Sequence, residues 1–270
     1  MTDWLAFSRS VVEEVKGVLR ELPTRLEREP IVGAGEGGDE TTAVDAEAER
    51  AAVRKLEELH ESGVEFTLVS EELGERFFGA ERPRLVLDPI DGSMNAKRGV
   101  PFFSVSLAVA DGPSMDDVFF GFVQDFGTGE EWVARRGEGA FLNGGPLTGP
   151  GPKEEVEILS FEATRTDSVA AQVGEMVGFA ERTRVMGSLA LTLCHLAAGR
   201  VDAVCSLKPA RSVDIAAAQL LVRERGLAID LPDRPPFGSA PLDLTPHSRV
   251  VAGATPAVCA ELYRRLSSSR

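Results

Sequence analysis

Two aspartates stand three residues apart at the end of a hydrophobic stretch, in RLVLDPIDGSMN. The residues before Asp88 predict a strand, and Pro89 disfavours a helical conformation for Asp88, so we expect the strand to reach that acid. The turn that follows can direct the carboxylates of Asp88 and Asp91, with the carbonyl of Ile90 between them, to one point. Hard divalent cations such as Mg²⁺ prefer oxygen ligands of this kind. The spacing therefore favours a site for one Mg²⁺ ion or a pair of ions, and a solvated turn is the alternative.

The two aspartates need a counter-charge, and the residues after them suit a phosphate group. Two uncompensated carboxylates this close would repel each other, and one would stay protonated unless a cation were bound. Gly92 and Ser93 follow, and backbone N–H groups at the start of a helical turn, with a glycine that admits a ligand, can hold a phosphate. A metal site beside a phosphate site is the arrangement that metal-assisted hydrolysis of a phosphate ester requires.

Two more acids stand at predicted element ends. Glu71 follows a predicted strand at 64–70, and Asp214 opens a predicted helix that follows another strand. Either acid alone is as well explained by a helix cap or a solvated turn. The four acids together make a shared metal site the competing interpretation.

The elements that must position these acids differ between the two halves of the chain. The first half reads as α+β, and the Gly/Pro cluster at 144–152 separates it from a second half in which strands and helices alternate. We expect a domain at 1–147 that carries most metal ligands and an α/β domain at 153–270 that completes the site. The expected elements of the first half are helices at 3–22 and from Thr42, where Asp45 forms a capping box, a glycine-rich loop at 33–40, strands at 64–70 and 84–88, and a strand meander at 102–136. Those of the second half are helices at 167–180, 187–199, 212–226 and 254–268 and strands at 155–161, 201–207, 227–230 and 249–253.

Composition narrows the class of protein. The 270 residues carry a formal net charge of −14, which argues against binding to nucleic acid or to an anionic membrane surface. The three cysteines form no disulfide framework, which indicates a reduced, cytoplasmic compartment. No stretch approaches the ~20 apolar residues of a membrane span, so we expect a soluble protein.

Four sequence blocks occur in a recognisable order. They are SEE at 70–72, DPIDGSMN at 88–95, RRGEGAFLNGGPL at 135–147, and GSLALTLCHLAAGRVDAV followed by SVDIAAAQLLVRERG. Together they resemble the inositol monophosphatase superfamily of Mg²⁺-dependent, often lithium-sensitive phosphatases, over about residues 40 to 253. The resemblance implies a sugar-phosphatase-type layered α-β-α-β-α sandwich with the active site between its halves. It also implies a homodimer.

The same resemblance implies roles for individual residues. Ligands of two or three Mg²⁺ ions would be Glu71, Asp88, the Ile90 carbonyl, Asp91 and Asp214. Ser93 and Glu71 would orient a metal-activated water that attacks phosphorus directly, and Asp45 would lie near that water in addition to capping its helix. Substrate would contact Asp91, the backbone N–H groups of Gly92 and Ser93, and, from the second domain, Gly187 and Ser188.

Departures from the family pattern bear on the substrate. Ser206 stands near the place of an acid that contacts inositol in animal-type enzymes, and Lys208 and Arg211 follow it. These cations suit a second phosphate, unless they belong to a solvated basic loop. The short chain resembles the archaeal-type dual inositol monophosphatase and fructose 1,6-bisphosphatase group. We therefore expect inositol 1-phosphate, fructose 1,6-bisphosphate or both as substrates. The alternatives are a phosphatase for 3′-phosphoadenosine 5′-phosphate or another nucleotide, and a regulatory binding protein on the same fold.

Overall fold

The computed structural model describes residues 2–36, 40–162 and 165–268, so positions 37–39 of the expected glycine-rich loop lie outside the described residues. The helices within these ranges are α1 (Trp4–Glu21), α2 (Arg25–Arg28), α3 (Ala43–Glu61), α4 (Ser93–Arg98), α5 (Thr166–Val173), α6 (Leu189–Ala197), α7 (Ser212–Glu224) and α8 (Pro256–Ser267). The strands are β1 (Ile31–Ala34), β2 (Glu40–Thr42), β3 (Phe66–Ser70), β4 (Gly74–Asp91), β5 (Ser104–Ala110), β6 (Val118–Asp125), β7 (Glu131–Arg135), β8 (Gly139–Leu142), β9 (Gly145–Pro146), β10 (Val156–Glu162), β11 (Ala180–Val185), β12 (Ala203–Ser206), β13 (Ala228–Asp230) and β14 (Val251–Gly253).

Among the described residues the strands form three sheets. The first sheet has seven strands in the order β3-β4-β5-β6-β7-β8-β9, the second has five in the order β11-β10-β12-β14-β13, and β1 pairs with β2. In the first sheet, the meander from β5 to β9 is antiparallel throughout. In the second, β10 runs parallel to both of its neighbours, whereas β14 is antiparallel to β12 and β13.

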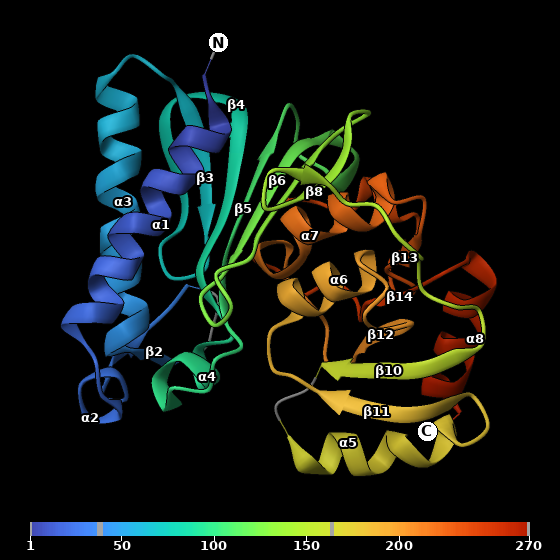
Figure 1. Ribbon diagram of the computed structural model, residues 1–270. Helices are drawn as coiled ribbons and strands as arrows, with labels where there is room; N and C mark the ends of the chain where they lie inside the picture. The colour runs from blue at the N-terminus through green and yellow to red at the C-terminus, as the bar shows by residue number, and fades with distance from the viewer. Residues whose placement is uncertain (1, 37–39, 163–164, 269–270) are drawn as a thin grey trace.

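Helices and sheets alternate in layers, as Figure 1 shows: α1 with α3 at the left, then the first sheet, then α6 with α7, then the second sheet below them, with α5 at the bottom and α8 at the right. This is the mixed α/β sandwich that the sequence predicted. The outer helix α1 illustrates why the layers form. Its buried Phe7, Val11, Val15 and Val18 recur every three or four residues, and the first three join a buried cluster with residues of α3 and of the first sheet. Asp3 caps its start by accepting the N–H of Ala6 at 3.0 Å.

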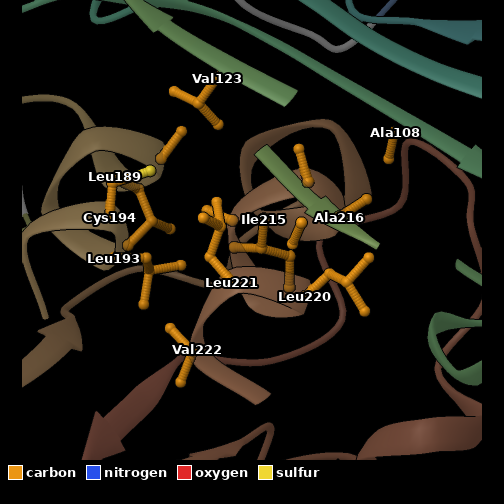
Figure 2. Packing of buried hydrophobic residues seen from close by; sticks show 14 of the residues in the cluster. Ala108, Val123, Leu189, Leu193, Cys194, Ile215, Ala216, Leu220, Leu221 and Val222 are labelled. Carbon is orange, nitrogen blue, oxygen red and sulfur yellow. The ribbon is translucent and has the colours of Figure 1, made fainter. Parts of the chain in front are cut away.

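The central layer joins the two halves of the chain. One buried cluster contains Val86 and Val123 of the first sheet, residues of α6 and α7, and Val204 of the second sheet. Figure 2 shows part of it, in which Val123 of β6 is labelled together with Leu189 and Leu193 of α6 and Leu221 of α7. The sequence division at 147–153 separates the two sheets but not the core, so the two-domain boundary stays a prediction.

The strands that the sequence analysis missed include β1, β2 and β11, and it overextended one helix. The expected helix 167–180 ends as α5 at Val173, with a short 3₁₀ turn at Gly174–Met176, and the polar segment AERTRV that follows is the edge strand β11. β11 is mostly solvent-exposed along its length, so it lacks the apolar alternation from which strands are recognised. Among the described residues, no helix is long and apolar enough to cross a membrane.

Candidate active site

Glu71 directly follows β3, and Asp88 lies in the neighbouring strand β4, at the same end of these two strands. β3 and a stretch of β4 run in parallel with Ser70 opposite Leu87, so Glu71 and Asp88 come next to each other. Asp88 is 2% exposed, and its Oδ1 accepts the backbone N–H of Ile90 at 2.9 Å. Ser93 Oγ in turn donates to the Ile90 carbonyl at 3.0 Å. The strand therefore does not end at Asp88 as the sequence predicted: β4 runs on to Asp91, with an irregularity in its pairing with β5 between the two aspartates.

Asp91 links the turn to the second half of the chain. Its Oδ2 accepts the hydroxyl of Ser188, which is the N-cap of α6, and the backbone N–H of Ala190 at 2.9 Å. Ser188 is 1% exposed, and the structure directs its hydroxyl to Asp91. Its expected contact with a substrate stays a prediction.

Gly92 and Gly187 meet at the junction of the halves. Both have positive φ, of 94° and 90°, and a Cβ on Gly92 would lie 3.1 Å from the carbonyl oxygen of Gly187. Asn95 holds this junction, because its amide donates to Phe102 O at 2.7 Å and to Met186 O at 2.8 Å. The sequence analysis gave Asn95 no role, because it considered only the acids and the Gly92–Ser93 backbone of DPIDGSMN.

Asp45 starts α3 as predicted, in a capping box with Thr42, and its Oδ2 accepts the Thr42 N–H at 3.1 Å. Its Oδ1 is buried and has no hydrogen-bond partner. Glu72 ties the neighbouring β1–β2 hairpin to the site, since its carboxylate accepts the hydroxyl of Thr41 and its carbonyl accepts the N–H of Glu36.

Asp214 arrives on the first turn of α7 together with an arginine. Its Oδ2 accepts the backbone N–H of Arg211 at 2.7 Å. The Arg211 guanidinium lies 3.0 Å from Asp214 Oδ1 and 2.7 Å from Glu71 Oε1. Arg211 is 9% exposed, so it does not belong to the solvated basic loop that the sequence left open.

These groups surround one cavity of about 310 Å³ between the two halves. Its lining includes the predicted residues Asp45, Glu71, Asp88, Ile90, Asp91, Gly92, Ser93, Gly187, Lys208, Arg211 and Asp214. It also includes Lys97, Glu162, Glu40 and Met94, which the sequence analysis did not identify as site residues. Two of these could have been predicted from the sequence. Lys97 comes shortly after DPIDGSMN, in the short helix α4, and Glu162 is the last residue of β10, much as Glu71 directly follows β3.

Glu71, Asp88 and Asp91 hold their protons more tightly than free carboxyl groups do. Burial, followed by the charges of Glu71, Asp91 and Asp214, raises the pKa of Asp88 well above its ordinary value. Burial also raises the pKa of Asp91 to about 7, against the lowering effect of the Ser188 hydroxyl. The pKa of Glu71 is likewise raised to about 7 by burial, although Arg211 opposes the shift. Clustered acids of this kind are typical of sites that bind a cation.

The residues present fit a Mg²⁺ site by chemistry. All the donors are hard oxygens, and the unpartnered Oδ1 of Asp45 is a buried polar atom in the same lining. In the side-chain positions of the described residues, no group of three or more His, Cys, Asp or Glu stands ready to hold a metal ion. The guanidinium of Arg211 lies between two of the acids instead.

Comparison with known proteins agrees with this arrangement. The sequence pattern of the inositol monophosphatase family matches residues 3–269. A fructose-1,6-bisphosphatase/inositol-1-monophosphatase of Archaeoglobus fulgidus is 32% identical over 253 residues, which cover 93% of this chain and 93% of the relative. A protein of the same description from Methanothermobacter thermautotrophicus is 32% identical over 234 residues, covering 83% of this chain and 82% of the relative.

A solved structure described as an inositol monophosphatase-fructose 1,6-bisphosphatase superposes with a TM-score of 0.83 at 25% identity, over 98% of this chain and 100% of that one. The family pattern spans nearly the whole chain, and the sequence relatives cover most of it. The chain therefore belongs to the inositol monophosphatase family.

Proposed function

We propose that this family phosphatase hydrolyses inositol 1-phosphate, fructose 1,6-bisphosphate or both, in a reaction that depends on Mg²⁺. The observation that carries the proposal is the convergence of four acids from both halves of the chain on one cavity that also has cationic side chains in its lining. The two archaeal relatives are named for these two activities, which supports the choice of substrates.

Glu71, Asp88, the Ile90 carbonyl, Asp91 and Asp214 would hold the metal. Bound there, Mg²⁺ supplies positive charge to phosphoryl oxygens and makes a water molecule more acidic. The protein's own groups orient the reactants. Ser93 and Glu71 direct the attacking water, and the backbone N–H groups of Gly92 and Ser93 receive the phosphate.

The cations in the lining favour a substrate with a second anionic group. Lys97 comes from α4 in the first half, and Lys208 comes from the segment between β12 and α7 in the second half. A bisphosphate brings two dianionic ends into a cavity rich in acids, so cations at both walls would offset the repulsion. We therefore expect removal of Lys97 or Lys208 to raise the KM for fructose 1,6-bisphosphate more than the KM for inositol 1-phosphate.

The test is phosphate release with Mg²⁺ from inositol 1-phosphate, fructose 1,6-bisphosphate and 3′-phosphoadenosine 5′-phosphate, side by side. Asp91→Asn should lower kcat/KM by about 100-fold or more, since loss of a ligand removes several kcal/mol of transition-state stabilisation. Asp111→Asn, a change of the same kind at an exposed ion pair with Arg136, is the matched control and should keep its activity.

Each outcome is distinct. The proposal is supported if the unmutated protein cleaves inositol 1-phosphate or fructose 1,6-bisphosphate and Asp91→Asn does not. If only 3′-phosphoadenosine 5′-phosphate is cleaved, the protein is a nucleotide phosphatase and the proposed substrates are wrong. If no substrate is cleaved, a regulatory binding role on this fold becomes the better account. The homodimer stays a prediction, which sedimentation of the purified protein tests.

A further inference from the structure

We propose that Arg211 is an internal counter-cation of the metal site: it pairs with Glu71 and Asp214 in the metal-free protein and must leave them before Mg²⁺ can bind. The inference rests on the proposed Mg²⁺ dependence and adds a step to it. Arg211 then competes with the metal, and the two cations occupy the carboxylates in turn.

The contacts of the guanidinium carry the first step. One nitrogen of Arg211 reaches Glu71 Oε1 at 2.7 Å and Asp214 Oδ1 at 3.0 Å, so a single cation bridges an acid of the first half and an acid of the second. Both acids are among the expected metal ligands. A Mg²⁺ ion would need the same two carboxylates, and its charge would be repelled by the guanidinium of Arg211 paired with them.

Burial carries the second step. The side chain of Arg211 is 10% exposed, and those of Glu71 and Asp214 are 13% exposed each. Carboxylates withdrawn from water to this degree are unfavourable without a counter-charge. Burial lowers the pKa of Arg211, but the charges of Asp214 and Glu71 outweigh burial and raise it, so the guanidinium remains charged. The metal-free site is thereby kept folded around an arginine.

The backbone around Arg211 carries the third step, because it leaves the side chain as the part that can move. Ala210 N donates to Ser248 O at 2.8 Å, and Ser212 Oγ donates to Asp243 O at 2.6 Å. These bonds hold the chain on both sides of Arg211. Since the side chain also lines the cavity of about 310 Å³, rotation of its bonds can turn the guanidinium from the acids into the space where a phosphorylated substrate would lie.

The experiment is a Mg²⁺ titration of the metal-free protein by calorimetry, without substrate, together with the unfolding temperature before and after Mg²⁺. Arg211→Gln should bind Mg²⁺ about tenfold more tightly than the unmutated protein, because the competing charge is gone. Its metal-free form should melt at a lower temperature, and Mg²⁺ should raise that temperature by more. Arg211→Lys keeps the charge on a different side chain and should bind Mg²⁺ with an affinity between the two, which covers the case in which Arg211→Gln does not fold.

Lys208→Gln is the matched control. It removes another cation from the same lining, and its Mg²⁺ affinity should stay within about threefold of the unmutated protein. Equal or weaker Mg²⁺ binding by both Arg211 variants, with binding by the unmutated protein intact, would overturn the inference and leave the proposed function standing. Absence of Mg²⁺ binding by every protein, the unmutated one included, would overturn the proposed function as well.

Discussion

Two groups of acids in this protein have opposite electrostatic surroundings. In the cavity, burial and neighbouring acids raise the pKa of Asp88 well above its ordinary value. Beside α8, Asp233 receives hydrogen bonds from Arg249 and from the hydroxyl of Tyr263, and the Arg249 guanidinium is the main cause that lowers its pKa to about 2. One group is buried among like charges, whereas the other is partly exposed beside an opposite charge.

The difference separates acids that serve the site from acids that serve the fold. Buried carboxylates with raised pKa values destabilise the folded state at neutral pH, while a paired carboxylate stabilises it. An unfavourable arrangement of this kind persists where a ligand needs it. The comparison predicts that neutralising Asp88 lowers activity and raises stability, and that neutralising Asp233 does neither.

The largest expected effect belongs to Asp88→Asn. Its activity should fall by about 100-fold or more because a metal ligand is lost. The free energy of unfolding of the metal-free protein at pH 8 should rise, because a carboxyl group whose pKa is raised by folding costs stability above its ordinary pKa, and the amide does not. Urea denaturation and phosphate release on the same preparation check both. If the free energy of unfolding falls together with activity, the Asp88 carboxylate does not cost stability, and the contrast between Asp88 and Asp233 fails.

Glu49 on α3 extends the comparison to a buried acid outside the cavity lining. Burial raises its pKa from 4.5 to about 7, although the Ser70 hydroxyl donates to its carboxylate. Because the folded state holds this proton more tightly than the unfolded chain, the stability it contributes is complete below pH 4.5 and is lost as the pH rises through about 7. Glu49→Gln should therefore be more stable than the unmutated protein at pH 8, by on the order of 3 kcal/mol, and similar to it at pH 4.

Unfolding at a series of pH values measures this difference. Glu57→Gln, at an exposed position of the same helix, is the matched control and should leave the pH profile unchanged. A Glu49→Gln profile parallel to that of the unmutated protein would count against the raised pKa.

The contact between β6 and α7 helps to bring the cavity acids together, and a substitution there provides a third test. A Cβ at Gly121 on β6 would lie 2.5 Å from the carbonyl oxygen of Ala217 on α7, the helix that carries Asp214. Gly121→Ala should destabilise the protein by about 1–3 kcal/mol, as overpacked cores do, and lower activity by displacing α7. Gly174→Ala, where a Cβ meets nothing within 4 Å, is the control. Equal stability of the two variants, measured by urea denaturation, would show that α7 tolerates displacement.

Asp233→Asn should have the smallest effect. The folded pKa of about 2 lies below the ordinary 3.8, so the stability from this group is present above pH 3.8 and is lost as the pH falls through about 2. The side chain is 29% exposed, so screening limits the loss at pH 7 to under about 1 kcal/mol. Phosphate release should be unchanged, and acid unfolding should begin at a higher pH than in the unmutated protein. A fall in activity as large as that of Asp88→Asn would remove the distinction between the two groups.

The acids of the site could be predicted from the sequence, but their hydrogen-bond partners could not. Asp88 and Asp91 stand within four residues of each other, so local strand and turn preferences were enough to predict them as a pair. The contact of Asp91 with Ser188 and Ala190 joins residues almost a hundred positions apart, and it depends on how α6 meets the first sheet. No local pattern contains that information.

The same limit applies to the elements. The apolar periodicity of α1 was readable because one of its faces is buried against the sheet. The edge strand β11 has no such face, and its polar sequence concealed it. For Arg211, the sequence supplied a cation near the site but not its partners, since the pairing with Glu71 forms only when the two halves come together.

The most direct test of the account is the rate of phosphate release as a function of Mg²⁺ concentration, from inositol 1-phosphate and from fructose 1,6-bisphosphate. The central claim is that the acids of the cavity act through a bound divalent cation. It predicts no phosphate release after treatment with a chelator, and recovery of the rate as Mg²⁺ is added back to the unmutated protein but not to Asp88→Asn. An undiminished rate in the presence of the chelator would contradict it.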